Sequence, residues 1–218
     1  MPIFTPIGLF SKLQTAATIS LTANATSGAD ATTYTFSGQS LGTAVSNRKI
    51  LVGIAGGTSN RTVSSCTVGG VSATLVKRQQ GAAQVTAELW IADVPTGTTG
   101  DVVVTWSGTN DRMGIGVYRL LSSAASSTMG SNALTPTGTI DCPANGVIVG
   151  CVCQQGSAPL TFTWTGITEK YDETCEGNTT QSGASDAFAT VQTGRTITAT
   201  PSGVALDAAM AVASFGPY

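Results

Sequence analysis

Large apolar residues alternate with polar residues in three consecutive segments between residues 84 and 121. The residues on one side of each extended segment are Val85, Ala87, Leu89 and Ile91, then Val102, Val104 and Trp106, and finally Met113, Ile115 and Val117. Turn-forming residues separate the segments at Pro95, Gly97, Gly100 and Asn110. Because side chains on a strand point alternately to opposite faces, this period of two predicts three half-buried strands in an antiparallel meander.

The pattern of residues 49–121 recurs about 95 residues further along the chain, which indicates an internal duplication. The segment KILVGIA, which begins at Lys49, matches GVIVGCV, which begins at Gly146. Segments that begin at Gly69, Gly100 and Met113 match segments that begin at Thr165, Gly194 and Ala208. The two halves cover about residues 33–121 and 134–218. The nearly unbroken apolar run in KILVGIA predicts a central strand that is covered on both faces.

These patterns predict an all-β protein, and two architectures fit a duplication of this size. The halves could be the two related parts of one antiparallel, jelly-roll-like β-sandwich, or they could be two tandem Ig-like sandwiches. No Pro-rich or charged linker marks a boundary near residue 130. We therefore expect a single sandwich over residues 32–218.

Residues 1–31 are predicted to be an N-terminal arm. Its apolar residues gather near the start, at Ile3, Phe4, Ile7, Leu9 and Phe10, and a polar Thr/Ala/Ser/Asn stretch follows. The pattern is typical of a docking arm, and equally of a first strand with a linker. The start lacks a positively charged region and is interrupted by prolines, so we do not expect a secretory signal.

The composition argues against several classes of function. Charged residues make up 10% of the chain, and the net charge of −2 provides no basic patch for nucleic acid. No apolar run approaches the roughly 20 residues that span a bilayer, so we expect no membrane partner. The chain contains no histidine, which removes the commonest general base and the commonest transition-metal ligand. We therefore expect neither an enzyme nor a bound cofactor.

The densest group of charges has four carboxylates, at Glu169, Asp172, Glu173 and Glu176. Such a group could hold Ca²⁺ through oxygen ligands. Its spacing matches no EF-hand loop, and a solvated strand end explains it without a metal ion.

Five cysteines cannot all pair within one monomer. Cys151 and Cys153 fall on the same face of a predicted strand. They are interpreted as small buried apolar residues, or as partners of Cys175 in a disulfide.

Trp90, Trp164 and Tyr171 could form a platform on which a sugar stacks, if they met on one exposed sheet face. Aromatic residues that alternate in strands are usually core or interface residues instead.

Four segments of the first half carry a resemblance to a known class of protein. They read ILVGIAGG from Ile50, VGGVSATLV from Val68, ELWIADVPTGTTGDVVVTWSG from Glu88 and GIGVYRL from Gly114. With their counterparts in the second half, they resemble β-sandwich proteins encoded among the structural genes of tailed bacteriophages and related gene-transfer particles. The resemblance covers about residues 33–215. It implies an accessory particle protein, such as a capsid decoration, a head spike or fibre base, or a tail-attached component, and it supplies no site residues.

We therefore expect a non-enzymatic virion protein on the exterior of the particle. It would form a homo-oligomer, a trimer or a pentamer, and dock on capsid or tail proteins through residues 2–13. The alternative is a carbohydrate-binding or adhesin module that reads glycans on the host surface, which requires exposed, roughly coplanar Trp or Tyr side chains.

Overall fold

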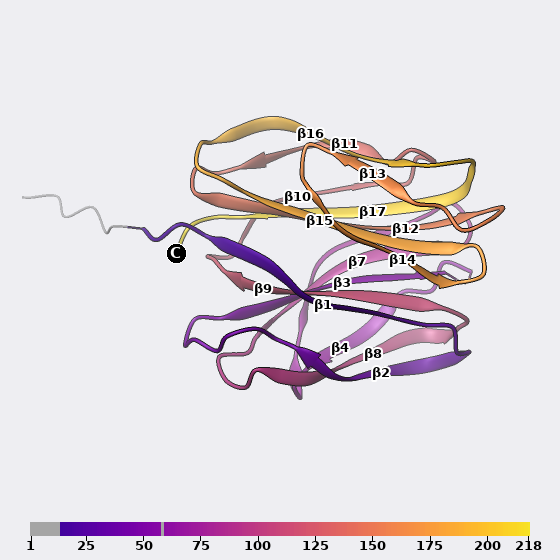
Figure 1. The fold of residues 1–218 in the computed structure, drawn as a ribbon, viewed down its shortest axis with the longest axis horizontal. Coiled ribbons are helices and arrows are strands. Elements are labelled where there is room, and N and C mark those ends of the chain that lie inside the picture. Colours follow the sequence, from indigo (N-terminus) through magenta and orange to yellow (C-terminus); the bar gives the residue numbers. More distant parts are fainter. Residues whose placement is uncertain (1–13, 58) are drawn as a thin grey trace, which may run out of the picture.

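The computed structural model describes residues 14–57 and 59–218. Their regular structure is entirely β (Figure 1). The strands of the first half are β1 (Thr18–Ser27), β2 (Ala31–Ser40), β3 (Lys49–Gly57), β4 (Val63–Val68), β5 (Val71–Ser72), β6 (Thr74–Gln80), β7 (Val85–Asp93), β8 (Thr99–Asn110) and β9 (Met113–Leu121). Those of the second half are β10 (Ala125–Ser131), β11 (Thr137–Cys142), β12 (Gly146–Gly156), β13 (Phe162–Thr165), β14 (Glu169–Glu176), β15 (Thr179–Phe188), β16 (Gln192–Pro201) and β17 (Ala205–Phe215).

The two halves have the same topology. The first half forms a large sheet in the order β1-β9-β3-β7-β6 and a small sheet in the order β2-β8-β4-β5. The second half repeats this order with β10-β17-β12-β15-β14 and β11-β16-β13, without a counterpart of β5. All pairings are antiparallel, and most successive strands cross from one sheet to the other, as in a jelly roll. The meander predicted between residues 84 and 121 is therefore wrong: β7 and β9 lie in the large sheet, β8 lies in the small sheet, and none of the three pairs with another.

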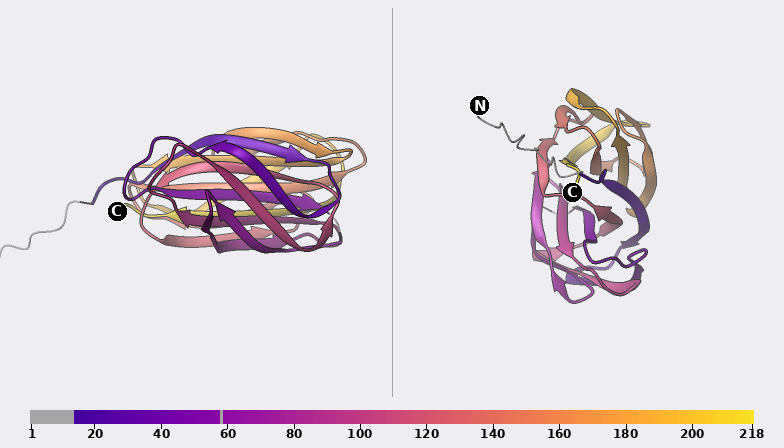
Figure 2. Two further views of the ribbon diagram at one scale, coloured as in Figure 1. Left: turned by 90° about the horizontal axis from the view of Figure 1, so that it is seen from below. Right: turned by 90° about the vertical axis from the view of Figure 1, so that its left-hand side faces the viewer.

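The four sheets are stacked as layers, with the two small sheets outside and the two large sheets in the middle (Figures 1 and 2). The antiparallel sheets thus pack face to face, as the sequence predicted. Each half is a sandwich of its own with its own core, and the two sandwiches are joined along their large sheets. The expected single sandwich over residues 32–218 is thus divided into two stacked ones.

Three apolar cores fill the spaces between the layers. One lies inside the first sandwich, around Trp106, and one inside the second, around Trp164. The third lies between the two large sheets and includes Leu89, Tyr118 and Phe215. Strand β3 faces two cores at once, which explains why almost every residue in it is buried.

Strand β1 begins at Thr18, inside the segment predicted to be an arm. Its register against β9 shifts between Leu21 and Ala23. Because a one-residue slip moves side chains to the opposite face, Leu21 contacts the core between the halves, whereas Ala23 contacts the core of the first sandwich. The sandwich therefore starts at Thr18, and not at residue 32 as the sequence pattern indicated.

The duplication holds strand by strand but not residue by residue. The sequence alignment places Gly53 opposite Gly150. A Cβ on Gly53 would touch Cys151 in the core between the halves, whereas a Cβ on Gly150 would touch Trp164 inside the second sandwich. The two glycines therefore point to non-equivalent sides, and the alignment is wrong by an odd number of residues.

Candidate functional site

Both ends of the described chain meet at one end of the molecule (Figure 1). Thr15 donates its backbone N–H to Tyr218 O at 2.7 Å, and Tyr218 donates its own to Thr15 O at 2.9 Å. Ala17 N–H then bonds Asn145 O at 2.8 Å and leads the chain into β1. We call this region the terminal end and define it by residues 14–17, Asn145, Gly146, 187–189 and Tyr218.

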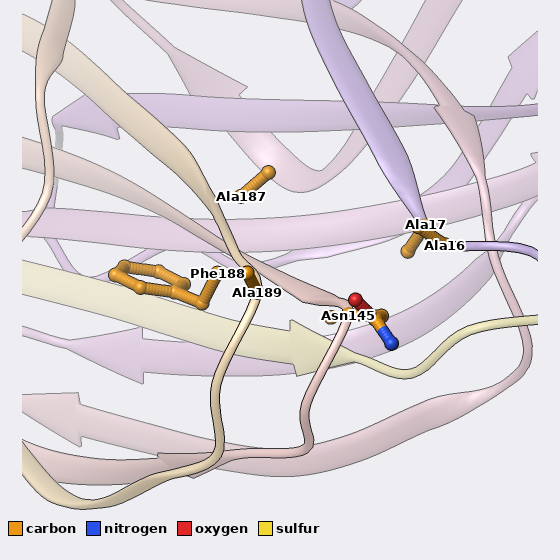
Figure 3. Close-up of a pocket in the computed structure, with 7 residues that line it drawn as sticks. Ala16, Ala17, Asn145, Ala187, Phe188 and Ala189 are labelled. Atoms are coloured by element: carbon orange, nitrogen blue, oxygen red, sulfur yellow. The ribbon is translucent and has the colours of Figure 1, made fainter.

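A cavity of about 280 Å³ opens at the terminal end. Figure 3 shows that its walls come from three separate parts of the chain: the approach to β1, the turn between β11 and β12, and the end of β15. The lining residues are Ala16, Ala17, Asn145, Gly146, Ala187, Phe188 and Ala189. None of their side chains is charged, and four of the seven residues are alanines, so the cavity suits an apolar group.

The edge of β15 is unpaired beside this cavity. Strand β14 pairs with β15 only as far as Ala184, and Ser185 then donates its N–H to Thr168 O at 3.0 Å. Backbone groups of alternate residues point to the same edge, so the N–H and C=O of Ala187 point the same way as those of Ser185, away from β12. Within the described residues, Ala187 has no backbone partner on that edge.

The surroundings of the cavity carry one positive charge and one exposed apolar side chain. The Arg195 guanidinium lies 4.5 Å from the ring centroid of Phe188 and donates to Gly166 O at 2.6 Å. Val191, in the turn after β15, is 64% exposed. An attached partner would therefore cover apolar surface at this end.

A second cavity, of about 200 Å³, lies at the start of β3 and the end of β7. Its lining includes Ala124 and Ala125 at the start of β10, and the first cavity is lined by Ala16 and Ala17 just before β1. The Lys49–Asp93 ion pair stands at its rim. The two cavities thus occupy corresponding places in the two halves, and the one beside the termini has the more apolar lining.

The four carboxylates of the predicted acidic group do not converge. Asp172 accepts a hydrogen bond from Phe162 N, and Glu173 accepts one from Asn24 Nδ2. Glu176 packs against Gly28. Burial raises the pKa of Glu169, and the charge of Asp172 raises it further. Among residues 14–57 and 59–218, no group of three His, Cys, Asp or Glu residues is placed to hold a metal ion.

The disulfide considered for Cys175 is not formed, and all five cysteines are free and buried. Strand β15 lies between β12, which carries Cys151 and Cys153, and β14, which carries Cys175. Two strand spacings separate such Cα atoms by roughly 9–10 Å, beyond the reach of a disulfide. Burial raises the pKa of Cys151 and of Cys175 to about 12, so neither is a reactive thiolate at neutral pH.

The three aromatic residues considered for glycan stacking lie in three different cores. Trp90 is inside the first sandwich, Trp164 is inside the second, and Tyr171 is between the halves, each at most 8% exposed. The indole of Trp90 donates to Glu88 Oε2, and that of Trp164 donates to Ser182 Oγ. They cannot form a common platform, because alternation in their strands turns them inward.

The predicted docking residues Ile3, Phe4, Ile7, Leu9 and Phe10 lie outside the described residues. The cavity at the terminal end could not be predicted from the sequence, because its lining consists mainly of alanines. Alanine carries little periodic signal, and only the long-range pairing of strands brings these residues together.

No helix in the part of the chain that the structure describes could cross a membrane. No protein family, curated protein or solved structure gave a match to this chain.

Proposed function

We propose that this chain is a non-enzymatic structural component of a virus particle. It is attached through its N-terminal segment and the terminal end, and its opposite end faces outward. The observation that carries the proposal is the meeting of Thr15 and Tyr218 beside an uncharged cavity and an unpaired strand edge. An attached segment that leaves from this place orients the long axis of the molecule away from the attachment surface (Figure 2).

The buried charged groups support a structural role, because their hydrogen bonds are made within the fold. The Arg48 guanidinium donates to five backbone carbonyl oxygens, those of Val94, Leu41, Gly42, Thr96 and Gly97. Glu88 accepts hydrogen bonds from Arg78, Trp90 and Val63 N. Buried ionic groups with these partners stabilise loops and strand ends and have no donor or acceptor left for a substrate.

The partners proposed for this chain are capsid or tail proteins and further copies of itself, on the exterior of the particle. A capsid decoration or a head spike or fibre base fits an elongated sandwich attached at one end. The adhesin alternative is not favoured by any observation, since the three aromatic residues that suggested it are buried.

The test compares the full chain with a chain that begins at Gln14, in cells that produce the particles. The truncation stops at Gln14 because a cut at Ala31 would remove β1 and unfold the large sheet. After nuclease treatment and sedimentation, the full chain is expected with the particles and the shorter chain in the supernatant. Absence of the full chain from purified particles would refute the proposal.

A further inference from the structure

We infer that the cavity at the terminal end and the free edge of β15 form a receptor for the N-terminal segment of a second copy of this chain. The segment pairs as a short strand with Ala187 and places the ring of Phe10 in the cavity. Copies joined in this way exchange their N-terminal segments around the attachment surface.

The strand edge supplies the directional part of this recognition. Ala187 offers one N–H and one C=O on an edge that β14 does not cover, and the residue itself is exposed. An extended peptide that adds to such an edge gains main-chain hydrogen bonds, while neighbouring pockets select its side chains.

The cavity supplies the apolar part. At about 280 Å³, it is at the lower limit of small-molecule sites, and its size suits one aromatic side chain. Four of its lining residues are alanines, whose small side chains leave room for a larger apolar group.

The N-terminal segment has the matching chemistry. Residues 1–13 are rich in large apolar side chains and carry a single charged side chain, that of Lys12. Phe10 is the aromatic residue nearest to the described chain. At about 3.3–3.6 Å per extended residue, it is within reach of a neighbouring copy that stands on the same surface.

The occupant is a second copy because of the direction in which the chain enters the fold. The segment at Thr15 pairs in antiparallel fashion with the segment at Tyr218. This pairing places residue 14 beyond the end of the sandwich. Ala16 and Ala17 already form one wall of the cavity. For its own Phe10 to return to this cavity, the chain would have to reverse within about four residues.

This inference rests on the proposed function only for the role of the assembly on a particle; the association itself does not depend on it. Association through Phe10 needs no particle, and residues 1–7 remain available to contact one. Copies that associate in solution but never reach particles would therefore refute the proposed function and leave the inference intact.

The test mixes two singly substituted full-length chains, Phe10→Cys and Ala189→Cys, which carry tags of different mass. Under mild oxidation, a disulfide-linked heterodimer of the two tagged chains is expected. Ala133→Cys replaces Ala189→Cys in the control, because Ala133 is an exposed alanine in the loop between β10 and β11. A heterodimer no more abundant than in the control would overturn the inference. A chain that carries both Phe10→Cys and Ala189→Cys is tested alongside. If a disulfide forms only within that chain and not between the two singly substituted chains, the inference is also overturned.

A second comparison avoids engineered cysteines. Ala189→Phe fills the cavity with a ring from the chain itself, and Ala133→Phe adds the same ring elsewhere. Sedimentation equilibrium is expected to show self-association weakened at least about tenfold by Ala189→Phe, the factor that the burial of one aromatic side chain provides. It should be unchanged by Ala133→Phe. Equal association of both variants, or a wild-type chain that stays monomeric, would overturn the inference.

Discussion

The carboxylate of Asp207 joins the two halves at the level of single atoms. It accepts hydrogen bonds from four successive backbone N–H groups of the turn before β7, with lengths of 2.7, 3.2, 2.6 and 3.0 Å for Ala82, Ala83, Gln84 and Val85. These donors belong to the first half and the carboxylate to the second. The turn is therefore held in place by a residue more than a hundred positions away.

Asp207→Asn is expected to lower the free energy of unfolding by about 2–3 kcal/mol, because one charged acceptor and its hydrogen bonds to backbone N–H groups are lost in a buried site. Urea unfolding followed by tryptophan fluorescence measures the difference. Asp101→Asn is the control, since the carboxylate of Asp101 accepts a hydrogen bond from Gly38 N at an exposed site and should matter much less. A loss no larger for Asp207→Asn than for Asp101→Asn would contradict this account of the turn.

The pH dependence of stability follows from the same group. Burial raises the pKa of Asp207, but the backbone N–H groups lower it more, and the net pKa lies below its usual value of 3.8. A depressed pKa contributes stability that is present above the unfolded value and is lost as the pH falls through the folded one. Unfolding measured from pH 6 to pH 2 should therefore show a loss below about pH 4 that is smaller in Asp207→Asn. Parallel curves for the two proteins would contradict the prediction.

Residue-level features were the hardest to predict from the sequence. Nothing in the neighbourhood of Arg48, Glu88 or Asp207 distinguishes them from solvated charges, because their partners come from distant segments. Conversely, Trp90 and Trp164 were correctly described as typical core residues, and only their alternative role as a sugar platform was wrong.

At the scale of strands, the unpaired edge of β15 predicts which positions tolerate proline. The N–H of Ala187 points to the free edge, whereas the N–H of Asp186 points to β12, with which the strand pairs at Ile148. Ala187→Pro should cost at most about 1 kcal/mol, and Asp186→Pro should cost about 3 kcal/mol or more. Asp186→Ala corrects for the lost side-chain bonds to Thr168. Thermal unfolding that ranks the two proline variants in the opposite order would show that the edge is assigned wrongly.

Strands were predicted best where alternation was strong. The segments between residues 84 and 121 became β7, β8 and β9, and the apolar run that begins at Lys49 became the central strand β3. Strand β1 was placed in an arm, because its bulge divides its apolar residues between two faces. A pattern that changes face within one strand has no clear period of two.

At the scale of the whole molecule, the termini occupy a place that corresponds to a connection inside the chain. In the middle of the chain, β9 is followed directly by the segment that leads into β10. At the termini, the end of the chain after β17 lies in the same way beside the segment that leads into β1, although no peptide bond joins them. The two-sandwich stack would therefore remain closed if the ends were joined and the chain were opened elsewhere.

A circular permutant in which a short Gly/Ser linker joins Tyr218 to Gln14, with new ends between Ser123 and Ala124, is expected to fold to the same structure. Its free energy of unfolding should lie within about 2 kcal/mol of the parent, because loop-closure entropy changes slowly with loop length. Circular dichroism and urea unfolding check this. As a contrast, new ends between Ile54 and Ala55 cut the central strand and should abolish folding. A permutant at Ser123 that is as unstable as the one at Ile54 would contradict the equivalence.

The overall class was readable from sequence, whereas the stacking was not. Duplication and alternation predict sheets that pack face to face. They do not say that a second apolar face, with Leu51 and Leu89 on one side and Val149 on the other, joins the halves. In the sequence, the residues of that face cannot be told from residues of the cores inside each sandwich. Packing between distant segments decides which of the three cores each residue belongs to.

The measurement that tests the proposed attachment most directly is amide hydrogen exchange of the full chain, free and bound to particles. We expect protection on binding at residues 14–17 and 187–189, and unchanged exchange in the loop of residues 132–136, which lies away from the terminal end. Protection that appears at residues 132–136 instead, or bound protein with exchange identical to that of the free chain, would contradict attachment through the terminal end.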